Sequence, residues 1–239
     1  MRYRTGLLVA AAAATLAACS GNNNQAGDNM AMADNGMAGN AMAAGDDQAD
    51  TQNLVAEATA EVQQMKGDPQ VAKLLQKAKG VYIVPEFGRG ALIVGGKGGA
   101  GVVMAKSNGA WTSSPAFYDF GSLSVGAQAG GSGGRIAFLL MTDKAVNAFM
   151  SGNKISLDAD SGLSIVNYSA NAEASWGKGD IILWSDTAGA YAGATIGVSD
   201  LNWDDDNNQA YYGKQVQPQQ VLTGQVTNPN AAQLQQALP

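Results

Sequence analysis

The sequence predicts an α+β fold: mainly an antiparallel β sandwich or barrel-like sheet, with N-terminal helices and short C-terminal helices. From Thr51 to Gly80, apolar residues recur at the three- and four-residue spacing of helices. From Gly80 onward, short apolar runs alternate with glycine-rich turns. No crossover helix separates these runs, as parallel strands would require, so they favour antiparallel pairing.

Two helices are expected before the first strand. The first begins at Thr51 and carries one apolar stripe, formed by Leu54, Val55, Ala58, Val62 and Met65. Residues 67–69, Gly-Asp-Pro, break it, and Asp68 is placed to cap a second helix with Pro69 at its first position. We expect Gly80 to end that second helix in the left-handed conformation.

Strands are expected where apolar runs meet turn residues. These runs are 81–84, 91–94, 102–105, 122–129, 136–141, 181–184 and 192–198. Asn108-Gly109 is the strongest short hairpin signal in the chain. A short helix is expected over 142–151, and one or two helical pieces from Pro218 onward.

The N-terminus has the pattern of a secretory signal peptide over residues 1–18. Arg2 and Arg4 precede an apolar stretch that is too short and too rich in alanine to span a membrane stably. The closing Leu-Ala-Ala-Cys19 resembles the lipobox of bacterial lipoproteins, which implies that Cys19 is acylated and becomes the first mature residue. Ser20, in place of aspartate, implies the outer membrane, with the protein facing the periplasm. The alternative is an ordinary signal peptide with an accidental cysteine.

Residues 19–50 are expected to form an acylated cysteine followed by a disordered tether. From Ser20 to Asp50 there is no Val, Ile, Leu, aromatic, Lys or Arg residue. Such a segment cannot bury enough apolar surface to offset its chain entropy. The remaining residues, 51–239, are expected to form a single domain.

Composition excludes several function classes. The chain has no histidine, which removes histidine-based catalysis and histidine metal sites, and a net charge of −6, which disfavours nucleic acid as a partner. Residues 96–101 satisfy the spacing of a dinucleotide-binding loop, but the next residues predict a strand where that site needs a helix. Residues 204–208 resemble a calcium loop only in composition, and we interpret them as a turn. We therefore expect no catalytic residues, no metal and no cofactor.

Positive charge is concentrated in one segment. Residues 66–97 hold six basic and two acidic residues, whereas the segments on either side have an excess of acids. A cationic helix face of this kind can bind anionic lipid headgroups. The candidate headgroup-binding residues are Lys73, Lys77, Lys79, Arg89 and Lys97. The alternative is a solvated helix face with no ligand.

Several glycine and aromatic motifs occur in an order that resembles the SYLF domain family. They lie at 78–85, 95–102, 111–117, 126–131, 191–193 and 211–213, and the resemblance covers residues 54–225. It implies lipid binding, which in eukaryotic members concerns phosphoinositides, and in some of them actin. A Gly-Pro turn that the family usually has is replaced here by Gly162-Leu163-Ser164.

Together these observations predict an outer-membrane lipoprotein whose SYLF-like domain binds lipid without catalysis. The expected partner is membrane lipid, either anionic phospholipid or lipopolysaccharide. Two alternatives stay open. One is a structural envelope protein that acts through a protein partner, and the other is a carrier that encloses a hydrophobic small molecule within its sheet.

Overall fold

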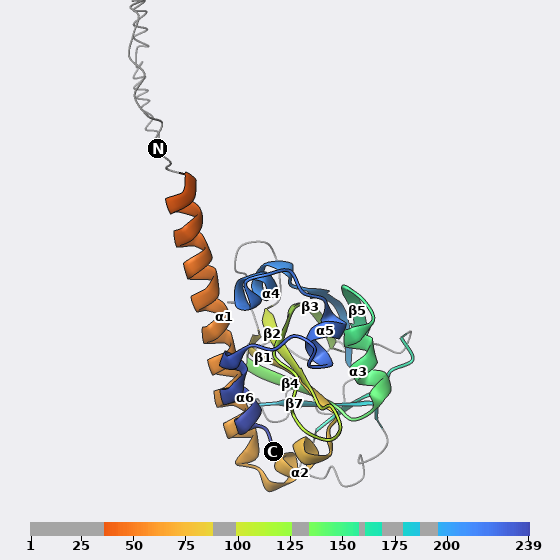
Figure 1. The fold of residues 1–239 in the computed structure, drawn as a ribbon. Helices are drawn as coiled ribbons and strands as arrows, with labels where there is room; N and C mark the ends of the chain where they lie inside the picture. Colours follow the sequence, from red (N-terminus) through yellow and green to blue (C-terminus); the bar gives the residue numbers. More distant parts are fainter. Residues whose placement is uncertain (1–35, 88–98, 126–133, 158–160, 169–178, 187–195) are drawn as a thin grey trace, which may run out of the picture. The chain divides into compact units, whose positions relative to one another are not determined.

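The computed structural model describes residues 36–87, 99–125, 134–157, 161–168, 179–186 and 196–239, which form one compact unit, Gly36–Pro239 (Figure 1). Its helices are α1 (Gly36–Lys66), α2 (Pro69–Lys77), α3 (Asp143–Met150), α4 (Asp205–Tyr212), α5 (Pro218–Leu222), η2 (Pro229–Ala231) and α6 (Ala232–Ala237). Its strands are β1 (Gly80–Phe87), β2 (Ala100–Ala105), β3 (Ala116–Val125), β4 (Gly134–Leu140), β5 (Lys154–Leu157), β6 (Ile165–Asn167), β7 (Ile181–Ser185) and β8 (Ile196–Trp203).

The strands form one sheet, in the order β5-β8-β3-β2-β1-β4-β7-β6. Every pair is antiparallel except β6 with β7. The strand β1 lies in the middle, where Tyr82 is opposite Val103 of β2 and Phe138 of β4. The predicted α+β class with a mainly antiparallel sheet is confirmed.

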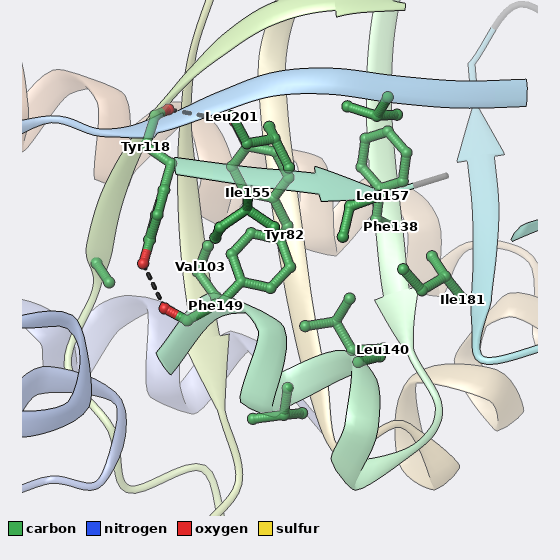
Figure 2. Close-up of a cluster of buried hydrophobic side chains, with 14 of the residues drawn as sticks. Tyr82, Val103, Tyr118, Phe138, Leu140, Phe149, Ile155, Leu157, Ile181 and Leu201 are labelled. Atoms are coloured by element: carbon green, nitrogen blue, oxygen red, sulfur yellow. Dashed lines mark hydrogen bonds between the residues drawn. The ribbon is translucent and has the colours of Figure 1, made fainter. Parts of the chain in front are cut away.

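Both faces of this sheet are buried. Successive side chains of each strand point to opposite faces, so each strand contributes to both. On β1, Tyr82 and Val84 point to one face, and Val81 and Ile83 to the other. We call the first cluster the inner core; it also contains side chains of α3, α5, β5 and β8, such as Phe149, Ile155, Leu157, Leu201 and Val221 (Figure 2). The second is the outer core, which also contains residues of α1, α2, α4 and α6, such as Val62, Leu74, Tyr211 and Leu234.

Aromatic rings fill the centre of the inner core. The Tyr82 ring lies 5.9 Å from that of Phe138 and 5.4 Å from that of Phe149, between ring centroids. The Tyr82 hydroxyl donates to the carbonyl of Tyr118 at 3.2 Å, and the Tyr118 hydroxyl donates to the carbonyl of Phe149 at 2.5 Å (Figure 2). These side chains occupy the space in which a hydrophobic carrier would place its ligand, so the described core gives that alternative no support.

Two boundaries near the first helices differ from the predictions. The helix α1 begins at Gly36, before the helix start predicted at Thr51 and within the segment 19–50 that was predicted to be a tether. Alanine and methionine, which favour helices, are frequent there and extend the helix backward from its packed part. Gly80 is not a left-handed cap, because α2 ends at Lys77 and Gly80 begins β1. A Cβ atom on Gly80 would lie 3.0 Å from the Met104 carbonyl oxygen, so its role is close strand packing.

Other local predictions are confirmed. Asn108 and Gly109 have positive φ angles of 52° and 83° and connect Ser107 to Ala110 in a tight turn. The helix expected at 142–151 is α3, and in place of the one or two helical pieces expected from Pro218 onward there are three, α5, η2 and α6. Other elements differ from the predictions. The strand expected at 122–129 already begins at Ala116, and the helix α4 was not predicted. The strand expected at 91–94 lies outside the described residues, as does the first part of that at 192–198.

Candidate functional site

The lysine face of α2 is set by the way this helix begins and packs. Asp68 caps it by accepting a hydrogen bond from the backbone N–H of Gln70 at 2.8 Å, with Pro69 at the first position, as predicted. Its apolar side is buried in the outer core through Val71, Leu74 and Leu75. Lys73 and Lys77 lie one turn apart with exposed side chains.

Lys79 lies just beyond α2 and is also exposed, but it has an acidic partner. Its ammonium group is 2.5 Å from a carboxylate oxygen of Asp143, the first residue of α3, and the two side chains are 47% and 77% exposed. A pair this exposed contributes little to stability and exchanges readily with water or with another anion. The other two predicted residues, Arg89 and Lys97, lie outside the described residues.

A further cation, Lys106, binds the carbonyl groups at the C-terminal end of α2. It was not among the residues predicted for this site. Its ammonium group donates to the carbonyls of Gln76 at 2.7 Å and Leu75 at 3.3 Å, and lies 4.6 Å from the centre of the Trp111 ring. A positive charge at this position stabilises the negative end of the helix dipole. Burial lowers the pKa of Lys106. Lys106 lies 30 residues after Gln76 in the sequence, so no local pattern predicts this contact.

The other motifs have structural roles. The strand β2 follows Gly99, where a dinucleotide site would have a helix, so that function is excluded as predicted. Asp204 caps α4 by accepting from the backbone N–H of Asn207 at 3.0 Å, so residues 204–208 begin a helix where we predicted a turn. Within the described residues, no cluster of three acidic, cysteine or histidine side chains is arranged to hold a metal ion.

A family model matches the C-terminal half of the chain. Residues 121–239, from β3 to the last helix, match the family model Ysc84, described as "Las17-binding protein actin regulator". This C-terminal part of the chain belongs to the Ysc84 family. This is the family that the glycine and aromatic motifs resemble under the name SYLF, so that prediction is confirmed.

Relatives from fungi and animals extend this match toward the N-terminal side. An SH3 domain-containing protein of Schizosaccharomyces pombe is 30% identical over 165 residues, 66% of this chain and 38% of its own length. The "SH3 domain-containing YSC84-like protein 1" of Bos taurus is 27% identical over 171 residues, 68% of this chain and 48% of its own. "Protein YSC84" of Saccharomyces cerevisiae is 29% identical over 169 residues, 66% of this chain and 35% of its own.

The chain therefore spans less than half the length of these relatives. Their names describe SH3-containing proteins, and the family model describes a binding protein and regulator; none of these names is that of an enzyme. Over the residues that the structure describes, no helix is both long enough and apolar enough to cross a bilayer.

Proposed function

We propose that this Ysc84 domain is a non-catalytic module that binds an anionic membrane surface through the lysine face of α2. The observation that carries the proposal is the position of Lys73 and Lys77, exposed one turn apart on a helix whose opposite side is fixed in the outer core. The nearby Lys79 can exchange its exposed Asp143 partner for a lipid phosphate. Anionic phospholipid and lipopolysaccharide present the same phosphate chemistry to these lysines.

The strength of this contact requires a second attachment. Each lysine near an anionic surface contributes about 1 kcal/mol, so two or three lysines alone bind weakly. Acylation at Cys19 would supply the missing affinity, because acyl chains contribute about 0.8 kcal/mol per buried methylene and keep the domain close to the bilayer. In this proposal the protein is an outer-membrane lipoprotein that faces the periplasm.

The anchor is tested by the intact mass of the protein isolated from its own cells. We expect a mature chain that begins at Cys19 and carries a diacylglyceryl group and a third acyl chain. As a control, a Cys19→Ser variant should lose the lipid mass and keep its leader. A native protein with a free Cys19 thiol would remove the lipoprotein from the proposal but leave the lysine face untouched.

The lysine face is tested by sedimentation with vesicles, using residues 20–239, which contain the whole unit Gly36–Pro239 and lack both the apolar leader and Cys19. At low ionic strength and in excess lipid, we expect weak but measurable binding to vesicles that contain phosphatidylglycerol and none to pure phosphatidylcholine. The double variant Lys73→Glu/Lys77→Glu should bind about thirtyfold more weakly, because two attractive contacts of about 1 kcal/mol each are lost. Vesicles that contain lipopolysaccharide, compared with phospholipid alone, distinguish the two lipid sources.

The matched control is Lys154→Glu/Lys214→Glu, which makes the same change in net charge at two exposed lysines outside α2. It should bind nearly as well as the parent. Equal weakening by both double variants would show that only net charge matters, and no binding by the parent would end the proposal. The description "Las17-binding" favours a protein partner as the second candidate, and retention of one stoichiometric protein in the absence of lipid would support that instead.

A further inference from the structure

Glu61 is a buried carboxylate in the interface between α1 and the sheet. Its side chain is 1% exposed, on the stripe of α1 that packs into the outer core. Neither of its carboxylate oxygens accepts a hydrogen bond from the described residues. A buried acid without hydrogen-bond donors strongly favours its neutral form, because the charged form loses its hydration.

The only described base beside Glu61 is shared with another acid. The Nε atom of Arg135, at the start of β4, lies 3.2 Å from a Glu61 oxygen but 2.9 Å from Asp186, to which it donates a hydrogen bond. The backbone N–H of Arg135 also donates to Asp186, at 3.0 Å. One half-exposed guanidinium group therefore faces two carboxylates, and Asp186 has the better geometry.

The other described charges near this part of α1 are acidic. Glu57 lies one turn before Glu61 on α1, and its pKa is raised by partial burial and by Glu86 near the end of β1. Among the described groups, Asp186 opposes a negative charge on Glu61 and Arg135 favours it, whereas Glu86 acts on Glu57. Within the described residues, a charge on Glu61 is therefore compensated only by the Arg135 guanidinium group, which Asp186 already holds.

We infer that Glu61 is a proton-sensitive latch, which holds α1 on the sheet when it is protonated and weakens this docking when it ionises. Burial raises the pKa of Glu61 from 4.5 to about 7, with Asp186 adding to the rise and Arg135 acting against it. The stabilisation is complete below pH 4.5, decreases as the pH rises, and is lost above pH 7. The inference does not depend on lipid binding.

Hydrogen exchange of the full chain, followed by mass spectrometry and corrected for the intrinsic rate, tests the latch. Between pH 6 and pH 8.5 the opening equilibrium of α1 peptides over 51–66 should rise about tenfold, while peptides of β1 and β4 change little. In Glu61→Gln, which keeps the shape without the charge, this rise should disappear. In Arg135→Gln, the same rise should occur at higher pH, because Glu61 loses its one opposing base.

The matched control is Glu57→Gln, the same change on the same helix but at an exposed side chain. It should keep the pH response of the parent. An unchanged response in Glu61→Gln would overturn the inference, as would a parent in which α1 and the sheet open together at both pH values. If Glu61→Gln does not fold, an unshifted midpoint in Arg135→Gln serves as the contradicting result.

Discussion

Replacing Gly101 with alanine should lower the free energy of unfolding by about 3 kcal/mol, because the added methyl group has no space. A Cβ atom on Gly101 would lie 2.4 Å from Cε2 of Tyr82 and 2.7 Å from two further atoms of that side chain. The Tyr82 ring cannot move away, since it is fully buried between Phe138 and Phe149 and its hydroxyl is hydrogen-bonded. Urea unfolding followed by tryptophan fluorescence measures the loss.

Two further variants show whether the Tyr82 ring is the cause. Gly152→Ala, whose nearest non-neighbouring atom would be 3.7 Å away, should change the free energy of unfolding by well under about 1 kcal/mol. In a double-mutant cycle, Tyr82→Leu should make Gly101→Ala less costly by about 1 kcal/mol or more, because the smaller side chain leaves room. Equal losses for the two alanine variants, or no coupling in the cycle, would contradict this explanation.

The role of Gly101 shows what the sequence could and could not predict in the sheet. Its pattern correctly places a strand at 102–105, within β2, and this strand excludes a dinucleotide loop. It cannot show that Gly101 faces the Tyr82 ring, because that contact depends on the register of β1 against β2, in which Tyr82 is opposite Val103. Long-range register is not encoded in local periodicity.

The same distinction applies to the candidate site. The spacing of buried residues in α2 was enough to predict that Lys73 and Lys77 lie on the exposed face. It could not show that Asp143 pairs with Lys79, or that Lys106 reaches the end of α2, because these contacts join distant parts of the chain. The contributions of Arg89 and Lys97 stay predictions.

The sequence contains a signal for the burial of Glu61. It lies three residues after Ala58 and four before Met65, so it belongs to the apolar stripe that was predicted for this helix and is buried with it. An acid at such a position indicates either a buried pair or a raised pKa. Which of the two applies depends on where Arg135 and Asp186 lie, and only the tertiary structure shows that.

Asn208 should be the second position at which a small change has a large effect. Its side-chain amide, 1% exposed, acts as an additional strand partner for the backbone of Phe117: it accepts from the Phe117 N–H at 3.2 Å and donates to the Phe117 carbonyl at 2.8 Å. It also donates to the carbonyl of Asp204 at 2.7 Å. Asn208→Ala leaves the buried Phe117 N–H without this acceptor, and we expect a loss of about 3 kcal/mol in the free energy of unfolding.

The matched control is Gln209→Ala, the next residue of α4, whose side chain is exposed. It should leave the free energy of unfolding within about 0.5 kcal/mol of the parent. Amide exchange measured by NMR gives a second readout, since the Phe117 N–H should lose protection in Asn208→Ala before its neighbours in β3 do. If Phe117 stays fully protected and both alanine variants are equally stable, α4 is held by its apolar contacts alone, such as Tyr211 against Phe117 at 5.1 Å between ring centroids. In that case the run of acidic and amide residues at 204–208 does no more than begin the helix.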